Sequence, residues 1–514
     1  MSSENVLTKI IATIGPASES PEVVRRLIET GVAIFRFNFS HGDFQAHERR
    51  LDLVRQISAE LDRPVACLGD LQGPKIRIGA VPDPGILVSP GQTVILRNGI
   101  SHALTEDHPA GPRAVFPTTY APIVREVLPG HRVLINDGAI RMLAAESPDG
   151  ELRCTVVVGG LITSGKGINL PQSDVSAPAI TDRDWECVAW AVENQLDFLA
   201  LSFVRNAAEI RELKERLAVM CPVSRHADLK GESASIPIIA KIEKPQAVEN
   251  IGEIIAAADG IMVARGDLGV EMDIARVPIV QKELIRAAHD WGKPVIVATQ
   301  MLESMTQSIS PTRAEASDVA NAVFEGADAI MLSAETAAGK WPNAAVETMR
   351  HIAAAVEENQ RAQAAPHEAP KELIRTRYQT AALAHGAWQI ARDVGARAIV
   401  CWSQSGGTAR YLSQNDFDVP IIAFSSSMRH CRRMAILRGV TAAYARVPDG
   451  PAPLAEWNEQ ADNLLQSRGF AKEGDPVVIL CGRPLGVAKA VNMVAVHRVG
   501  DDSSGLRTHK NAQR

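Results

Sequence analysis

Short apolar runs alternate with stretches of helical periodicity along most of the chain. Residues 9–15, 32–40 and 65–70 are apolar or β-branched runs, whereas residues 22–29 and 43–61 carry apolar positions near helical spacing. Gly31 follows the first helical stretch, as is common where a helix ends. The pattern predicts the order strand, helix, strand, helix, strand.

This rhythm stops between residue 71 and about residue 167. The segment contains many prolines, among them Pro82, Pro84 and Pro90, and its alternating runs at 93–97, 132–135 and 152–158 are short. Dense turn residues between brief strands are typical of compact β structure. We therefore expect a small β-barrel or sandwich inserted after the third strand.

The alternation of strands and helices resumes after the insertion. Strands are expected at 198–204, 238–243, 260–264, 294–299 and 329–333, and helices at 182–193, 207–220, 248–257, 278–290, 313–325 and 345–357. Without the insertion, this amounts to eight strands, each followed by a helix. The pattern favours a (β/α)8 TIM barrel, with a doubly wound open sheet as the alternative.

A second α/β rhythm begins near residue 372, after a stretch rich in Ala, Pro, Gln and Glu, with strands expected at 398–402, 420–424 and 476–480. Such a stretch between two rhythms is typical of a linker between domains. We expect a barrel domain at 1–70 and 168–358, an inserted β-rich domain at 71–167, a linker at 359–371 and a C-terminal α/β domain at 372–514.

Composition narrows the class of protein. Hydrophobic residues make up 46% and charged residues 22%, which is ordinary for a soluble globular protein. A net charge of −6 with 4% aromatic residues favours neither nucleic acid nor an anionic membrane. The seven cysteines are scattered without CxxC spacing, and no signal peptide or bilayer-spanning run is found. We expect a cytoplasmic protein with reduced thiols.

Polar and aromatic residues alternate strictly along the second strand. Because side chains on a strand alternate between its faces, Arg36, Asn38 and Ser40 share one face and three phenylalanines share the other. In a barrel the phenylalanines would meet the helices and the polar face would line the mouth. An Arg beside neutral oxygens suits an anion and a metal ion. The alternative is a polar strand end satisfied by water, although burying such groups is costly.

Charged residues also end the fifth and sixth strands. Lys241 and Glu243 share a face, and Asp267 follows the next strand. Two carboxylates from adjacent strand ends suit a hard cation such as Mg²⁺, and the ammonium can neutralise charge on a phosphoryl group or an enolate. The alternatives are a plain Lys241–Glu243 salt bridge and, for Arg265-Gly266-Asp267, an integrin-type tripeptide, which a barrel mouth disfavours.

Further candidates lie at other strand ends and at the two ends of the insertion. Thr299 ends the seventh strand and Glu335 follows the eighth, where a strand cap and a structural carboxylate are the alternative interpretations. Asp70 ends the third strand, and Arg77 lies shortly after it. Lys166 lies between two glycines where the insertion returns, so it can contact phosphate or belong to a simple turn. Cations at both ends of the insertion would suit a lid over phosphates.

Taken together and in order, these motifs resemble the pyruvate kinase family. The similar segments are 8–18, 36–42, 70–79, 166–171, 241–245, 262–271, 298–305 and 333–342, and the resemblance is dense over residues 7–350 but looser in the C-terminal domain. It implies Mg²⁺- or Mn²⁺-dependent phosphoryl transfer from phosphoenolpyruvate to ADP, giving pyruvate and ATP as the last step of glycolysis. It also implies a homotetramer with a regulatory C-terminal domain.

The resemblance implies a role for each matching residue. Lys241 would stabilise the transition state, and Glu243 and Asp267 would hold Mg²⁺. Phosphoenolpyruvate would contact Lys241, Gly266, Asp267 and Thr299, with Arg36 on its phosphate and a proton relay beginning at Thr299. The residues implied on the nucleotide side are Arg77, Lys166, Asn38 and His41.

The family often binds K⁺, here through Asn38, Ser40, Asp70 and the carbonyl of Leu71. Potassium-dependent members resemble Asp-Thr-Lys-Gly-Pro-Glu, whereas this chain reads Asp-Leu-Gln-Gly-Pro-Lys and ends that motif with Lys75. The ammonium of Lys75 can supply the positive charge that K⁺ provides in those members. We therefore expect activity that does not require a monovalent cation.

Small and hydroxylic residues from Ser403 to Ala409 follow a strand of the C-terminal domain, where the family keeps a sugar-phosphate effector site. The alternative is a capped strand-to-helix turn.

Two other functions are possible for the whole chain. One is an aldolase or lyase acting on phosphoenolpyruvate or pyruvate, and the other is a metabolite sensor without catalysis. Arg77 and Lys166, at the two ends of the insertion, disfavour an aldolase or lyase, because a second, nucleotide substrate explains them better. A sensor is disfavoured because it need not keep all of the site residues Arg36, Lys241, Glu243, Asp267 and Thr299.

Overall fold

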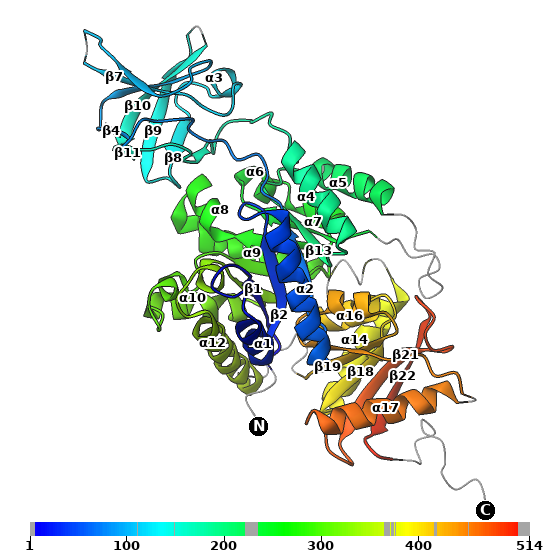
Figure 1. Cartoon of the computed structure of the whole chain (residues 1–514). Coiled ribbons are helices and arrows are strands. Elements are labelled where there is room, and N and C mark those ends of the chain that lie inside the picture. Colours follow the sequence, from blue (N-terminus) through cyan, green and yellow to red (C-terminus); the bar gives the residue numbers. More distant parts are fainter. Residues whose placement is uncertain are drawn as a thin grey trace, which may run out of the picture.

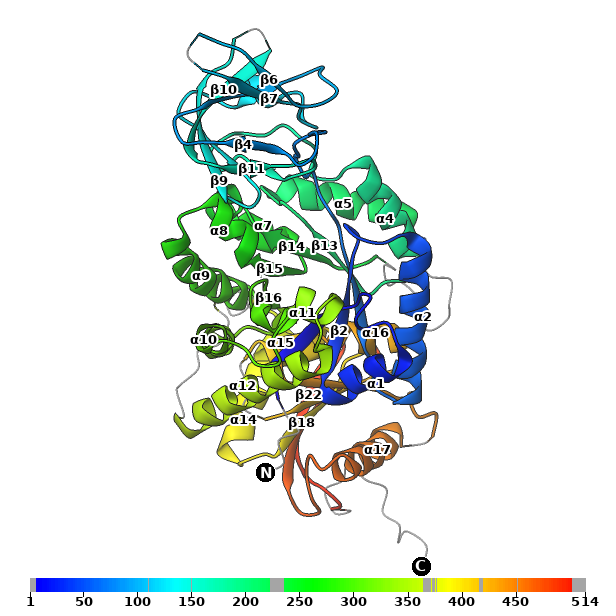
Figure 2. The same cartoon turned by 60° about the vertical axis from the view of Figure 1, so that its left-hand side comes forward.

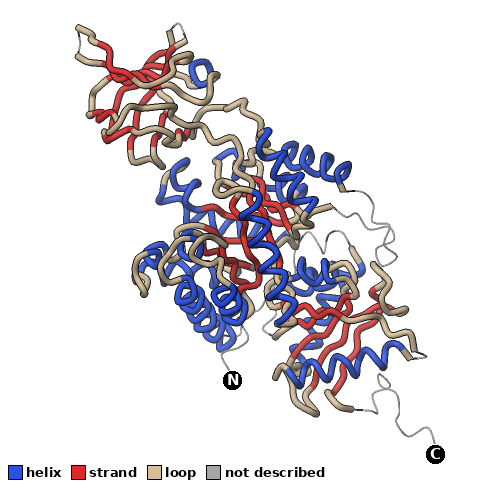
Figure 3. Tube along the Cα trace, viewed as in Figure 1, coloured by secondary structure: helices blue, strands red, loops and turns tan. Residues whose placement is uncertain are grey.

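The computed structural model has three parts arranged along one axis (Figures 1 and 2). The insertion stands at one end, the barrel lies in the middle, and the C-terminal sheet lies at the other end, so the strands form three separate groups in Figure 3. The structure describes residues 6–109, 111–148, 150–221, 235–363, 371, 375, 377–415, 419–450 and 452–501.

Eight parallel strands close into a barrel, as the alternation predicts, and the open-sheet alternative is wrong. Closure is made by the first and last strands, with Lys9 paired to Ala329 and Ala12 to Leu332. The strands are β1 (Lys9–Thr13), β2 (Val32–Asn38), β3 (Ala66–Asp70), β13 (Phe198–Leu201), β14 (Ile238–Ile242), β15 (Gly260–Ala264), β16 (Val295–Ala298) and β17 (Ala329–Leu332).

Helices surround the barrel, and their ends follow ordinary capping rules. Side chains of Ser20, Asp43, Thr181, Asn206 and Thr312 accept hydrogen bonds from the first turn of the helix that each precedes. The helices are α1 (Pro21–Thr30), α2 (Phe44–Glu60), α4 (Asp182–Glu193), α5 (Ala207–Met220), α6 (Pro245–Glu249), α7 (Ile251–Ala257), α8 (Arg265–Glu271), η2 (Ile274–Arg276), α9 (Val277–Asp290), η3 (Glu303–Thr306), α10 (Arg313–Phe324), α11 (Ala334–Ala337) and α12 (Pro342–Gln363).

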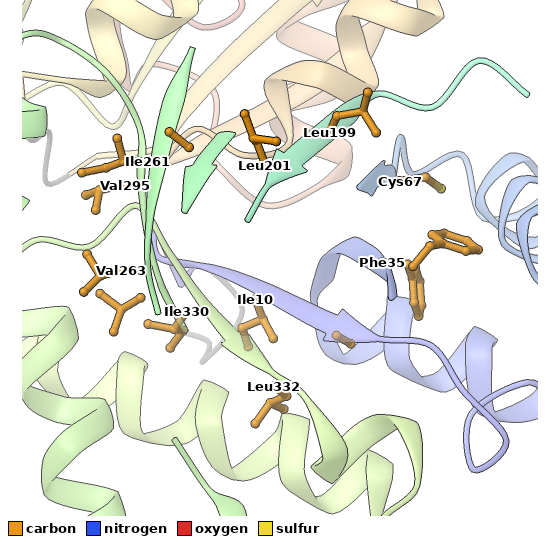
Figure 4. Close-up of a cluster of buried hydrophobic side chains, with 14 of the residues drawn as sticks. Ile10, Phe35, Cys67, Leu199, Leu201, Ile261, Val263, Val295, Ile330 and Leu332 are labelled. Carbon is orange, nitrogen blue, oxygen red and sulfur yellow. The ribbon is translucent and has the colours of Figure 1, made fainter. Parts of the chain in front are cut away.

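The main hydrophobic core lies between the barrel and its helices (Figure 4). Outward-facing strand residues such as Ile10, Leu199, Val263 and Ile330 are fully or almost fully buried there. The three phenylalanines of β2 and the loop after it belong to this cluster, as the alternation predicts. Their burial leaves the polar face of β2 directed to the barrel interior.

The insertion is β-rich, and its core is separate from that of the barrel. Its strands form a seven-stranded sheet and a two-stranded sheet, and the segment 77–80 bridges both ends of the larger sheet by isolated pairs, which gives a barrel-like closure. The elements are β4 (Ile86–Val88), β5 (Thr93–Arg97), β6 (Leu104–Glu106), β7 (Arg113–Phe116), α3 (Ile123–Glu126), β8 (Arg132–Ile135), β9 (Ile140–Glu146), β10 (Glu151–Val158), β11 (Gly160–Ile162) and β12 (Ile168–Asn169).

The C-terminal part is a five-stranded sheet in the order β20-β19-β18-β21-β22, parallel except for β22. Of the linker expected at 359–371, residues 359–363 instead continue helix α12, which runs to Gln363. Residues 364–370 and 502–514 lie outside the described residues. The elements are α14 (Gln379–Asp393), β18 (Ala398–Trp402), α15 (Gly407–Ser413), β19 (Ile421–Ser425), α16 (Met428–Met434), β20 (Val440–Tyr444), α17 (Pro453–Ser467), β21 (Pro476–Gly482) and β22 (Val491–Arg498).

The state of the cysteines and the character of the helices bear on two further expectations. All seven cysteines are buried and free. None of the helices in the described part of the chain combines the length and the apolar character that crossing a membrane requires.

Candidate active site

Charged side chains from four strands converge at the carboxyl end of the barrel. Arg36 lies on β2, Asp70 ends β3, Lys241 lies on β14 with Glu243 directly after it, and Asp267 lies in the first turn of α8, just after β15. Parallel strands bring these positions together because all their carboxyl ends meet at one rim.

Asp70 is at the centre of the ion-pair network and is 1% exposed. Its Oδ2 lies 2.6 Å from Nε of Arg36, and its Oδ1 lies 3.3 Å from Nζ of Lys241. Burial opposes ionisation of this carboxyl, but the charges of Lys241 and Arg36 outweigh burial and lower the pKa of Asp70 below its ordinary value. Asp70 therefore stays ionised and holds two cations side by side.

Lys241 is the second cation of this network and pairs with two carboxylates. Its Nζ lies 2.9 Å from Oε1 of Glu243 as well as near Asp70. Burial alone would lower the pKa of this ammonium, but Asp70 and Glu243 outweigh burial and raise it above its usual range. The salt bridge expected as the simple alternative is therefore present, within a network that presents a permanent positive charge at the mouth.

Glu243 and Asp267 are the two carboxylates available to a cation. Burial raises the pKa of Glu243, and the neighbouring charge of Asp267 raises it further, although Lys241 opposes both effects. A divalent cation would relieve this repulsion between carboxylates. In the described ranges, no cluster of three or more His, Cys, Asp or Glu side chains could hold a metal alone. A divalent cation held by these two carboxylates would take its other ligands from water or small-molecule oxygens.

The structure adds Ser202, which the sequence pattern did not predict. Nζ of Lys241 donates to its hydroxyl at 2.8 Å, and the hydroxyl donates to the carbonyl of Leu71 at 2.6 Å. The backbone N–H of the next residue, Phe203, donates to Oε2 of Glu243 at 2.6 Å. A hydroxyl near the expected end of the fourth barrel strand was the available signal, comparable to Thr299 at the end of the seventh strand.

Thr299 follows β16 in a left-handed backbone conformation, with φ of 68°, and Gln300 follows with φ of 53°. The Thr299 hydroxyl accepts a 2.7 Å hydrogen bond from the N–H of Gly266 and donates to the carbonyl of Ala298. A Cβ added at Gly266 would lie 3.2 Å from this hydroxyl, so glycine permits the close approach. Thr299 is thus fixed beside the residues that carry Asp267.

Glu335 has the environment of a structural carboxylate, which was the alternative interpretation for this residue. Its carboxylate accepts hydrogen bonds from the N–H groups of Leu302 and Ser333. It therefore connects the loops after β16 and β17, and it does not point to a further reacting group.

The two ends of the insertion lie side by side above the mouth. Nη1 of Arg77 donates to the carbonyl of Gly165 at 2.9 Å, and the N–H of Ile78 donates to the carbonyl of Lys166 at 2.8 Å. A cleft between the insertion and the barrel is lined by residues of both, including Lys75, Gly167, Lys244 and Asp267. The structure thus brings Arg77 and Lys166 together and places Lys75 on the wall of the cleft.

The remaining candidates lie at the rim near β2 and β3. His41 and Ser40 are exposed, and Oδ1 of Asn38 accepts a hydrogen bond from the N–H of Ser40 at 3.2 Å. The carbonyl of His41 lies 3.0 Å from Nε2 of His47. In the C-terminal domain, the Ser403 hydroxyl accepts from the N–H of Ala409 at 3.0 Å, as in a capped turn.

Nearly the whole length of the chain is similar to known pyruvate kinases. A model described as the barrel domain of pyruvate kinase matches residues 5–346, and one described as its alpha/beta domain matches residues 381–497. Pyruvate kinase of Mycobacterium intracellulare is 40% identical over 494 residues, which cover 96% of this chain and 98% of the relative. Pyruvate kinase 2 of a Synechocystis strain is 40% identical over 494 residues, with 96% and 79% covered. A pyruvate kinase structure from Cryptosporidium parvum superposes with a TM-score of 0.83 at 32% identity, covering 97% of both chains.

The barrel, the insertion and the C-terminal sheet thus have counterparts in a single family. The range matched by the barrel-domain model includes the segments that carry the convergent charges at the barrel mouth. The chain belongs to the pyruvate kinase family.

Proposed function

We propose that the pyruvate kinase reaction of this chain, phosphoryl transfer from phosphoenolpyruvate to ADP, takes place at the barrel mouth around Lys241, Glu243 and Asp267. The observation that carries this assignment is the buried network in which Lys241 lies within 3.3 Å of Asp70 and 2.9 Å of Glu243. Phosphoryl transfer needs positioning and neutralisation of charge more than covalent help from the protein. A fixed ammonium beside a cation site supplies both.

Glu243 and Asp267 fit a magnesium ion, or manganese in its place. Mg²⁺ is commonly held by one or two carboxylates, with substrate oxygens and waters in the other positions. When bound, the ion supplies positive charge to the oxygens of the transferring group. This fit agrees with the repulsion between the two carboxylates that contributes to the raised pKa of Glu243.

The protein groups around this site divide into three roles. Arg36, held by Asp70 and Thr13, offers its guanidinium to the phosphate of phosphoenolpyruvate. Lys241 neutralises charge that develops on the transferring phosphoryl group and on the enolate. The hydroxyl of Thr299 begins the proton path to the enolate carbon, which becomes the methyl group of pyruvate.

The nucleotide binds on the side of the insertion. Arg77 and Lys166 face the phosphates of ADP from the adjoining ends of the insertion, and Asn38 and His41 approach the nucleotide from the rim of the barrel. The insertion then acts as a lid that excludes water from the transferring phosphoryl group.

Lys75 replaces the monovalent cation of the family. It is exposed on the wall of the same cleft that Asp267 lines. The carbonyl of Leu71, one of the implied K⁺ ligands, already accepts a hydrogen bond from Ser202. We therefore assign the second positive charge of the site to the protein itself.

The C-terminal domain adds two proposals from the family, a sugar-phosphate effector at the loop from Ser403 to Ala409 and a homotetramer. Gly406 has φ of 84° there and precedes α15, so the loop turns tightly. Isothermal titration with sugar phosphates tests the effector, and light scattering after size exclusion tests the tetramer.

The experiment that tests the proposed function is a coupled assay for ATP from ADP and phosphoenolpyruvate, with Mg²⁺ or Mn²⁺ and with Na⁺, K⁺ or tetramethylammonium. We expect ATP and pyruvate in equal amounts, dependent on the divalent ion and similar in all three monovalent salts. Pyruvate without ATP would favour the aldolase or lyase alternative, and no turnover of bound substrate would favour the sensor.

A further inference from the structure

Thr299 occupies a conformation that its own residue type disfavours. A β-branched residue with φ of 68° is unusual for L-amino acids, and Gln300 directly after it is also left-handed. Such conformations persist only where surrounding contacts impose them, and they concentrate at functional sites. One contact of the Thr299 side chain is with the N–H of Gly266, directly before Asp267.

One side chain binds both residues of this left-handed pair. Nε and Nη2 of Arg265 donate to the carbonyl of Thr299 at 3.2 and 3.1 Å, and Nη2 donates to the carbonyl of Gln300 at 2.7 Å. The planar guanidinium can bridge two consecutive carbonyls, which a lysine ammonium cannot match with fixed geometry. Arg265 is also firmly placed, because its side chain is only 10% exposed.

Arg265 lies in the same helix turn as Asp267, and the N–H of Gly266 between them binds the Thr299 hydroxyl at 2.7 Å. One short segment therefore carries a metal-binding carboxylate, the donor to the Thr299 hydroxyl and the clamp on the Thr299 backbone. We infer that Arg265 is a positioning residue for the reaction, which holds Thr299 left-handed so that its hydroxyl stays bound to the N–H of Gly266, next to Asp267. The inference rests on the role proposed for Thr299.

The test is a double-mutant cycle on the full-length enzyme with Mg²⁺. We expect Arg265→Lys to lower kcat roughly ten- to hundredfold while leaving KM for ADP unchanged, because small misplacements of reacting groups have effects of this size. In a Thr299→Ala background the same substitution should have little further effect, because coupled residues are not additive. Adding Gln300→Gly to Arg265→Lys should restore part of kcat, since glycine adopts positive φ without strain.

Asp318→Asn is the matched control. The Asp318 carboxylate is 52% exposed and lies 3.5 Å from Nη1 of Arg265, so this variant removes an outer partner and leaves both carbonyl contacts in place. It should keep kcat. Arg265→Gln gives a second variant for the cycle if Arg265→Lys does not fold.

An equal fold-loss from Arg265→Lys in both backgrounds would show that Arg265 acts independently of Thr299 and would overturn the inference. Failure of Gln300→Gly to restore any activity would also count against it. A Thr299→Ala enzyme with normal kcat would instead refute the role proposed for Thr299, so the two failures are distinguishable.

Discussion

At the scale of single residues, the chemistry of the site depends on charges that neighbours hold in one protonation state. Asp70 has a lowered pKa and Lys241 a raised one, and each is a main cause of the other's shift. Burial opposes both charged forms, so only the close pairing keeps them ionised. The cation at the mouth is therefore permanent over the physiological pH range.

Replacing this cation should abolish most turnover without preventing substrate binding. We expect Lys241→Met to lower kcat by roughly 10²–10³-fold, because a preorganised charge on the transition state is lost. Steady-state kinetics and direct binding of phosphoenolpyruvate would measure the two effects separately. Lys214→Met, which breaks a partly exposed pair with Asp259 on the barrel surface, is the control and should keep its activity. An unchanged kcat in Lys241→Met would contradict the assignment.

Exchanging the charge at residue 75 should create a requirement for K⁺. We expect Lys75→Glu to lose activity in tetramethylammonium and to recover it with K⁺, because the site then lacks its own second cation. The measurement is the ATP-forming rate as a function of K⁺ concentration. Lys282→Glu, on helix α9, makes the same charge change at a residue that does not line the cleft and should show no such response. Equal rates of Lys75→Glu in both salts would refute the replacement of K⁺ by Lys75.

At the scale of elements, strand ends and helix starts position the site. The strand expected at 198–204 ends at Leu201. Phe203 is left-handed, with φ of 54°, and its N–H donates to Glu243. The capping box of α4 joins Thr181 and Asp184, and the other carboxylate oxygen of Asp184 binds the N–H groups of Gln72 and Gly73. One capping residue thus also anchors the start of the insertion.

Helix α16 carries a titratable group that makes stability depend on pH. Burial, together with the charges of Arg433 and Arg429, lowers the pKa of His430 from its ordinary 6.5 to about 4. Between these values the unfolded chain binds the proton more readily than the folded chain. Stability should therefore be lost as the pH falls from 6.5 to 4, by about 1.4 kcal/mol for each unit of pKa difference.

This dependence can be measured by denaturant unfolding across that pH range. His430→Asn should flatten it, whereas the control His351→Asn, at an exposed position of α12, should leave it as in the unsubstituted protein. A His430→Asn protein with an unchanged pH dependence would show that other groups cause the acid sensitivity.

At the scale of the whole molecule, a buried carboxylate connects the barrel to the C-terminal domain. Asp197 is fully buried, and its two oxygens pair with Arg55 of α2 at 2.8 Å and with Arg432 of α16 at 3.0 Å. Oδ2 also accepts from the N–H of Cys67 on β3 at 2.9 Å. This junction reaches from the C-terminal domain to the strand that ends at Asp70.

Removing the Asp197 charge should destabilise the molecule strongly. We expect Asp197→Asn to cost about 3–5 kcal/mol, because two arginines lose their buried partner. The control is Asp62→Asn, which removes an 87% exposed partner of Arg468 across the same domain boundary and should cost at most about 1 kcal/mol. Asn also tolerates the positive φ of residue 62. Similar unfolding midpoints for the two variants would contradict the buried role of Asp197.

The sequence pattern favours a barrel over an open sheet, and it predicts the place of the β-rich insertion and the strand ends that carry Arg36, Lys241, Glu243 and Asp267. It could do so because strand and helix periodicities are local, and because parallel strands direct their carboxyl ends to one rim. Helix 248–257, expected as one element, is instead the pair α6 and α7, since Pro245 starts a helix earlier than the apolar pattern indicates.

The contacts that join distant segments follow from the fold and not from local patterns. Ser202 binds both Lys241 and the carbonyl of Leu71, and Arg265 bridges two left-handed residues more than thirty positions away. Periodicity carries no information on such pairs, because backbone conformation at a strand end and the choice of buried partner depend on what packs around them. The protonation states of Asp70 and Lys241 follow from the same packing, since their pKa values are set by neighbours that only the fold brings together.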